Sequence, residues 1–182
     1  MTAPHPPSHD APVDHLVITL LRIDAAGCRR CDGTADNIAE ALRRLAPALE
    51  ALETTVTFDT VAVATAADAE RHRLPASPTV RINGIDIAPA VRETPCSDCA
   101  EACDCADDCA VECREWFWRG ETFSAAPVGL LVEAVLRAAL GSRSAPPAGD
   151  YRVPESLAGY FASLRRGTPE PCCGDTQTTT CC

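Results

Sequence analysis

The chain has twelve cysteines among its 182 residues, and they fall into three separate groups. The first group is the pair Cys28-x-x-Cys31, the second holds six cysteines between Cys96 and Cys113, and the third is two adjacent pairs at the end of the chain. Sulfur adds little to a core that valine or alanine would not also provide. This density of cysteine therefore indicates thiolate chemistry, disulfides or the binding of soft metal ions.

The composition disfavours an extracellular disulfide scaffold. Such scaffolds are mostly short chains, whereas 182 residues with 46% hydrophobic content can build a core of ordinary size. Residues 1–10 show neither a basic segment nor an apolar run typical of a secretory signal, and no apolar run approaches the roughly 20 residues that cross a bilayer. The net charge is −10, and the sequence shows no cluster of basic residues that would bind nucleic acid or anionic lipid. We therefore expect a cytoplasmic protein with neither a nucleic-acid nor a membrane partner.

Pro- and Gly-rich stretches divide the chain. We expect a disordered leader at 1–13, one domain at 14–141, a linker at 142–150, and a short helix followed by a cysteine tail at 151–182. Hydrophobic periodicity predicts the elements inside the domain. In chain order these are a doubly buried strand at 15–24, a helix at 35–53 that Pro47 should kink or split, a strand at 54–63, a short helix at 66–73, a hairpin at 77–87 turning at Asn83-Gly84, a second hairpin at 115–123, and a helix at 127–140.

Two motifs within this order resemble the thioredoxin fold. They are Gly27-Cys28-Arg29-Arg30-Cys31 at the first strand-to-helix junction and Ser77-Pro78-Thr79 before the third strand. The resemblance covers residues 16–140 without the cysteine-rich insertion, and it is closest to a family of small bacterial thioredoxin-like proteins with the same two motifs and a downstream Cys-x-x-Cys. It implies an α/β fold, with a mixed sheet flanked by helices and a cysteine-rich insertion at 92–114 before the last core helix. It also implies that Pro78 is a cis-proline facing the cysteine pair and that Cys28 is an exposed nucleophile.

The chemistry of the first pair follows from its place at the start of a helix. A thiol there meets unpaired backbone N–H groups and the positive end of the helix dipole, and both stabilise a thiolate. Cys28 is therefore expected to react and Cys31 to resolve the product or to act as a second ligand. The alternative is a pair of inert cysteines. The motif lacks the preceding aromatic residue and the internal Gly-Pro of thioredoxin, which disfavours efficient general disulfide reduction.

The second group suits a metal site. On one helix its six sulfurs would lie on about half of the circumference, and a loop wrapped around an ion is an equal alternative. Four thiolates at short spacing fit tetrahedral zinc or another soft ion, and acidic neighbours make an iron–sulfur cluster the weaker choice. We predict Cys96, Cys99, Cys109 and Cys113 as the ligand set. The remaining candidates are Cys103 and Cys105. A structural zinc site, a redox or transfer site, and disulfides all remain open.

The third group ends the chain with Cys172-Cys173 and Cys181-Cys182. Adjacent cysteines rarely bridge to each other, so the pairs are interpreted as flexible ligands for a soft ion. They are similar to the C-terminal vicinal cysteines of the arsenic metallochaperone family, in which three thiolates bind a trivalent metalloid. The alternative is an idle terminal segment.

These patterns together predict a thioredoxin-like thiol protein that binds or transfers a soft metal or metalloid ion of the zinc, arsenite or mercury class. A partner protein would receive the ion or the electrons. The enzymatic alternative is a thiol–disulfide oxidoreductase that uses Cys28 and Cys31, with Pro78 beside them.

Overall fold

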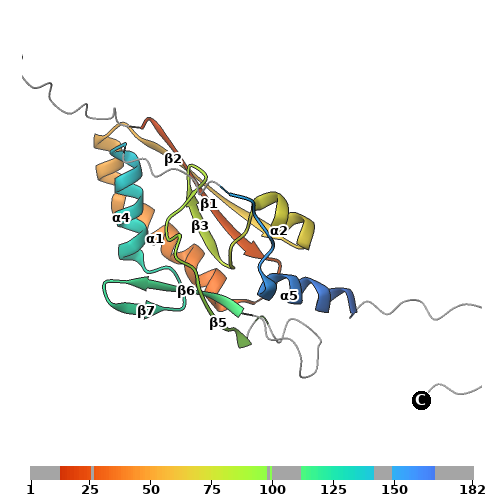
Figure 1. Cartoon of the computed structure of the whole chain (residues 1–182). Coiled ribbons are helices and arrows are strands. Elements are labelled where there is room, and N and C mark those ends of the chain that lie inside the picture. The colour runs from red at the N-terminus through yellow and green to blue at the C-terminus, as the bar shows by residue number, and fades with distance from the viewer. Residues whose placement is uncertain (1–12, 26, 98, 100–111, 142–148, 167–182) are drawn as a thin grey trace, which may run out of the picture.

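A computed structural model describes residues 13–25, 27–97, 99, 112–141 and 149–166, and its centre is a four-stranded mixed sheet (Figure 1). The strand order is β2-β1-β3-β4, with β1 parallel to β2 and antiparallel to β3. The strands of this sheet are β1 (His15–Ile23), β2 (Thr55–Val63), β3 (Thr79–Ile82) and β4 (Ile85–Asp86).

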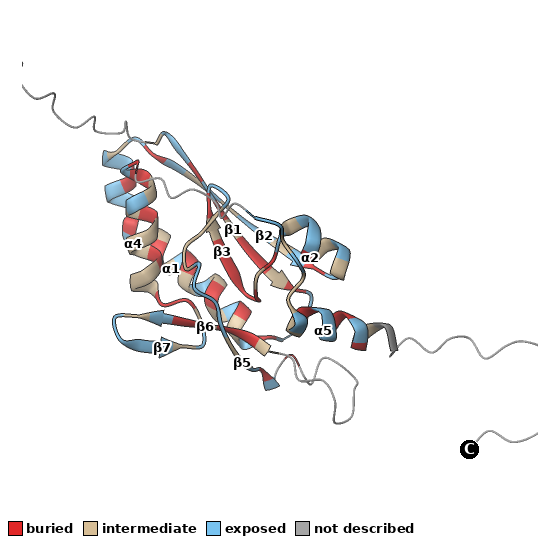
Figure 2. Ribbon diagram, in the orientation of Figure 1, coloured by how far each residue is buried: buried red, intermediate tan, exposed pale blue. Residues whose placement is uncertain are grey.

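Helices cover both faces of β1, because successive side chains of a strand point to opposite faces. Three residues of β1 share a core with α1 (Arg29–Ala51) and α4 (Val128–Ala139), and these residues are Leu16, Ile18 and Leu20. Leu21 and Ile23 belong to a second core with α2 (Ala66–His72) and α5 (Glu155–Arg166). Figure 2 shows β1 and β3 as mostly buried strands. The prediction of a strand buried on both faces is confirmed.

A second, smaller sheet follows the first in the chain. Its antiparallel order is β5-β6-β7, and its strands are β5 (Arg92–Pro95), β6 (Glu112–Trp118) and β7 (Glu121–Phe123). The predicted aromatic hairpin is the β6–β7 pair, and its turn residues Arg119 and Gly120 both have positive φ. This sheet lies between β4 and α4 in the chain, so the cysteine-rich segment precedes the last helix of the sheet core.

The local turn and cap predictions are confirmed at two places. Asn83 and Gly84 have φ values of 51° and 81°, as a tight hairpin with two left-handed turn residues requires. Pro127 is the N-cap of α4, and Gly141, with a φ of 82°, follows its C-cap.

Of the predicted kink or split at Pro47, the split is wrong, because α1 is one helix that begins at Arg29, directly after Cys28. Proline removes one backbone hydrogen bond. Leu45 and Leu49 on either side of it are buried in the core, and this packing holds the helix together through the missing bond.

The architecture is a mixed sheet flanked by helices, so the predicted α/β class is confirmed, and the arrangement is consistent with a thioredoxin-like fold. The last helix, α5, packs in the same core as the ends of β1 and β2. None of the helices in the described part of the chain combines the length and apolar character that crossing a membrane requires.

Candidate metal centre

Four buried cysteines converge at one end of the main sheet. The Sγ atoms of Cys28, Cys96, Cys99 and Cys113 all lie within 4.8 Å of one another. They come from three segments: the start of α1, the residues directly after β5, and β6. We call these four residues the cysteine quartet.

The start of α1 places Cys28 in the quartet. Cys28 is the N-cap of this helix, and its carbonyl accepts hydrogen bonds from the backbone N–H groups of Cys31 and Asp32, both at 3.0 Å. Its side chain makes no capping bond, so its sulfur is available to the other cysteines. The dipole of the helix favours negative charge at this end.

Arg30 holds the second sheet against the first turn of α1. Its guanidinium donates to Thr94 Oγ1 at 2.9 Å, to the Cys113 carbonyl at 3.2 Å and to the Pro95 carbonyl at 3.0 Å. Thr94 and Cys113 are also directly paired between β5 and β6. One arginine therefore ties Cys113 and the residue before Cys96 to the helix turn that carries Cys28.

The spacing of the quartet suits a single soft ion. Zinc binds thiolates at about 2.3 Å in a tetrahedron, which places the sulfurs about 3.8 Å apart. The Sγ atoms of Cys99 and Cys113 are 3.4 Å apart. The Sγ–Sγ distances of the other pairs in the quartet are all at most 4.8 Å. All four residues are buried, as in closed zinc sites that keep no position for a substrate. The quartet can therefore hold a metal ion.

Hydrogen bonds among the sulfurs give the quartet one preferred thiolate. Hydrogen bonds from Cys113, and then from Cys31 and Cys99, lower the pKa of Cys28. Hydrogen bonding to Cys28 raises the pKa of Cys113, and burial raises it further. For Cys99, the hydrogen bond from Cys113 lowers the pKa, but the bond to Cys28 and burial outweigh it, so this pKa is also raised. Without an ion, negative charge therefore concentrates on Cys28.

Cys31 is a fifth buried sulfur beside the quartet. Hydrogen bonding to Cys28 and burial raise the pKa of Cys31. Its Sγ lies 3.7 Å from Ser77 Oγ, and this hydroxyl accepts a hydrogen bond from the Ile23 backbone N–H at 3.1 Å. The peptide bond between Ser77 and Pro78 is cis, as the thioredoxin resemblance implies. The cysteine pair thus lies next to the residue that precedes this proline.

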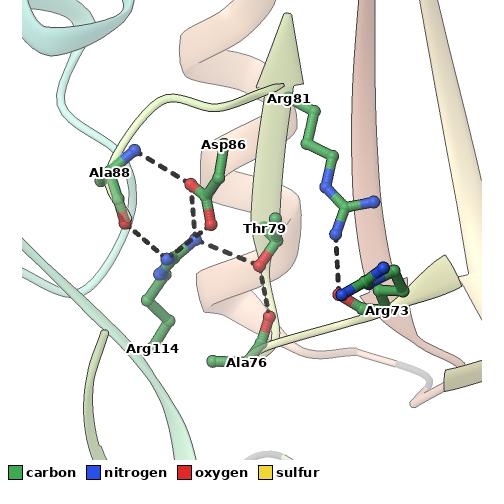
Figure 3. A network of polar contacts seen from close by, with 7 residues as sticks. All are labelled: Arg73, Ala76, Thr79, Arg81, Asp86, Ala88 and Arg114. Atoms are coloured by element: carbon green, nitrogen blue, oxygen red, sulfur yellow. Dashed lines mark hydrogen bonds and ion pairs between the residues drawn. The ribbon is translucent and has the colours of Figure 1, made fainter. Parts of the chain in front are cut away.

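A buried arginine fixes β6 immediately after Cys113. Arg114 is fully buried, and Figure 3 shows its guanidinium among Asp86, Thr79 and Ala88. It donates to both carboxylate oxygens of Asp86, at 3.2 and 2.9 Å, to Thr79 Oγ1 at 3.1 Å and to the Ala88 carbonyl at 2.6 Å. Its backbone N–H donates to the Ser77 carbonyl at 2.7 Å. The second sheet is thereby anchored to β3 and β4 beside a quartet cysteine.

The helix α5 packs into the same core as the centre. Its residues Leu157, Tyr160 and Phe161 are buried in the same core as the quartet and Cys31. Ser156 donates to the carboxylate of Glu93 on β5, so α5 is linked to the second sheet as well.

The predicted site residues are only partly brought together. Three members of the predicted ligand set, Cys96, Cys99 and Cys113, meet in the quartet, and Cys28 completes it. The fourth predicted member, Cys109, lies outside the described residues. So do the other six candidate cysteines, which are Cys103, Cys105, Cys172, Cys173, Cys181 and Cys182. Sequence reasoning did not identify Cys28 as a partner of the second group, nor Arg30 and Arg114 as residues that position it.

The expectation that Cys28 is exposed is wrong. Its exposed fraction is 0%, because the second sheet and α5 enclose the start of α1. A sulfur in this position is not an open surface nucleophile.

The model of one protein family, described as a domain of unknown function (DUF2703), matches residues 16–135. The match covers more than half of the chain, so the chain belongs to this family. Neither the curated proteins nor the solved structures contain a match to it.

Proposed function

We propose that this member of the DUF2703 family is a thioredoxin-like thiol protein that binds one soft metal or metalloid ion through Cys28, Cys96, Cys99 and Cys113. The observation that carries the proposal is the convergence of four buried sulfurs from three segments within 4.8 Å. Without an ion, packing four buried sulfurs this closely adds little to the stability of the folded protein. A shared soft cation would compensate the charge of all four thiolates.

Zinc is the ion class that fits the quartet best. Four thiolates form the closed tetrahedral set of structural zinc sites, whereas a trivalent metalloid takes three thiolates. An iron–sulfur cluster spreads its thiolates over several iron atoms, and the compact quartet favours one ion over a cluster. Arginine side chains offset the negative charge of a tetrathiolate centre. Arg30 contacts the Cys113 carbonyl, and Arg22, which pairs with Asp32 at 2.7 Å, adds a second positive charge near the centre.

We place the protein in the reducing cytoplasm. In that compartment clustered cysteines are metal ligands or redox groups more often than structural disulfides. Transfer of the ion to a partner protein would use the tail pairs Cys172-Cys173 and Cys181-Cys182, which offer four further thiolates for ligand exchange. In that role the protein would serve in metal or metalloid resistance.

The second candidate function is thiol–disulfide exchange by Cys28 and Cys31, with Pro78 beside them. The lowered pKa of Cys28 and the contact of Cys31 with Ser77 next to the cis-proline favour it. The burial of Cys28 weighs against it, because a protein disulfide would need to reach that sulfur. A turnover assay with a thioredoxin reductase or glutathione system separates the two functions, since a pure carrier shows no Cys28-dependent turnover.

Metal content tests the main proposal. We expect protein purified under reducing conditions to contain zinc, and a full-length chain whose seven cysteines outside the described residues are serine to bind about one ion. Replacement of this zinc by cobalt should give the intense visible bands of tetrahedral cobalt thiolate. Serine at any quartet position should abolish these bands or change them strongly.

Cys31→Ser is the matched control for these variants, because Cys31 is equally buried beside the quartet but is not part of it. It should leave the stoichiometry and the cobalt spectrum nearly unchanged. An unaltered spectrum in both Cys28→Ser and Cys113→Ser would contradict the proposal.

The pH dependence of binding follows from the state of the thiols. Hydrogen bonding to Cys28 and burial raise the pKa of Cys113, and the pKa of Cys99 is also raised, so both residues are protonated at neutral pH without an ion. Zinc binding must displace these protons, so the apparent affinity should rise steeply with pH near neutrality. Calorimetry in buffers of different ionisation enthalpy would count the protons. A pH-independent affinity between pH 6 and pH 8 would contradict the assignment.

A further inference from the structure

We propose that Cys28 and Cys31 form an oxidation site for hydrogen peroxide, and that closing their disulfide expels the ion from the quartet. This inference rests on the proposed function, because it assigns the control of the same centre. Its basis is that one sulfur, Cys28, belongs both to the quartet and to the Cys28/Cys31 pair.

The backbone already holds the two cysteines one helical turn apart. The Cys31 N–H donates to the Cys28 carbonyl at 3.0 Å, and the two side chains are in hydrogen-bond contact. Ser77 Oγ, at 3.7 Å from Cys31 Sγ, holds the second sulfur on its other side. Neighbouring residues of a helix turn satisfy the short Cα separation that a disulfide needs.

A competing pair exists within the quartet. Cys99 and Cys113 have their Sγ atoms 3.4 Å apart. When an ion is bound, both of these sulfurs are committed to it as ligands. Among the described buried cysteines, Cys31 alone is not a member of the quartet. It is therefore free to attack an oxidised Cys28.

The reaction balances with peroxide as the two-electron oxidant. The Cys28 thiolate attacks one peroxide oxygen, the O–O bond breaks, and the departing hydroxide takes a proton from solvent to form water, which leaves Cys28 as a sulfenic acid. Cys31 then attacks the Cys28 sulfur, the S–O bond breaks, and the second hydroxide leaves as water with the Cys31 proton. Two sulfurs are oxidised by one electron each, and one peroxide is reduced to two waters.

Loss of Cys28 as a ligand removes one of four thiolates from the ion. Three sulfurs from the second sheet region remain, and zinc would pass to a stronger ligand in solution.

The test uses zinc-loaded, full-length protein with serine at the seven cysteines outside the described residues, and the wild-type chain beside it. Peroxide is added in the presence of a chromophoric zinc chelator, and the disulfide is mapped after trypsin digestion. Cleavage at Arg22, Arg29, Arg30 and Arg43 separates the two cysteines, so their disulfide appears as peptide 23–29 joined to peptide 31–43.

We expect one zinc released for each disulfide formed, and release slowed at least about tenfold in Cys31→Ser, because an intramolecular thiol has a high effective concentration. Cys31→Ala serves as a second variant in case a buried hydroxyl disturbs the core, and zinc content before oxidation shows that each variant is folded. Equal release rates in wild type and both Cys31 variants would overturn the inference, as would a disulfide joining Cys99 to Cys113. Either result in protein that had bound zinc leaves the proposed function standing, whereas protein that binds no zinc overturns both.

Discussion

Zinc-loaded protein should unfold at a clearly higher denaturant concentration than protein stripped by a chelator. A ligand that binds only the folded state stabilises it by about 4 kcal/mol when its free concentration is a thousand times the dissociation constant. Zinc should stabilise the folded state strongly, because the quartet forms only on folding. Its members come from the start of α1, from the residues after β5 and from β6, which lie far apart in the unfolded chain.

The loss of stability on zinc removal should be local as well as global. Hydrogen exchange of stripped protein should speed up first at β5, β6 and the first turn of α1, where Arg30 and the quartet join the second sheet to α1. The core between α1 and α4, which contains Leu131 and Ile38, should keep its protection.

Two variants decide whether this stabilisation belongs to the quartet. Cys28→Ser should show little difference between zinc-loaded and stripped samples, whereas Cys31→Ser should keep most of the difference. Identical unfolding of loaded and stripped wild-type protein would show that the quartet is not a site for zinc under those conditions.

The elements that could be predicted from the sequence are those with a local signature. A continuous apolar run predicts the strand β1. Two adjacent residues that tolerate positive φ predict the turn at Asn83-Gly84. The helix α4 is marked by Pro127 before it and Gly141 after it. Each signal lies within the element it predicts.

The quartet has no such local signature. Cys96-x-x-Cys99 suggested a metal site, but the choice of its other ligands depends on which distant segment lies opposite. The pairing of Thr94 with Cys113 and the bonds from Arg30 make that choice. The Cys28 motif pointed toward redox chemistry by resemblance, and nothing in its spacing indicates that it shares an ion with residues of the second sheet.

Arg114 is a second feature that local sequence could not reveal. A single arginine in a strand usually lies at the surface with its charge in water, yet this side chain is 0% exposed. Its counter-ion, Asp86, is on β4, and only the meeting of the two sheets brings them together. Weakening the pair of Asp86 and Arg114 should therefore loosen the contact of β6, which carries Cys113, with the main sheet.

Asp86→Asn should be among the most destabilising polar substitutions in the described part of the chain. It keeps the size of the side chain but leaves the buried Arg114 guanidinium without its counter-charge, and such losses cost about 3–5 kcal/mol. The carboxylate now accepts two hydrogen bonds from this guanidinium and one from the Ala88 backbone N–H (Figure 3). Denaturant unfolding of the zinc-loaded variant measures the loss.

Glu40→Gln on α1 is the matched control, because Glu40 pairs with Arg43 and Arg44 at the surface, where solvent screens the charges. It should shift the unfolding midpoint only slightly. Equal stability of the two variants would contradict the role given to the Asp86 and Arg114 pair.

The pair should also affect the ion, because Arg114 follows Cys113 directly and its N–H is bonded to the Ser77 carbonyl beside Cys31. Loosening β6 moves one quartet sulfur relative to the other three, so zinc affinity should fall in Asp86→Asn and stay unchanged in Glu40→Gln. Replacing Asp86 and Arg114 together with apolar residues removes the unpaired charge and should recover part of the stability. Stability recovered without zinc affinity would show that the charge pair positions Cys113 in addition to holding the two sheets together.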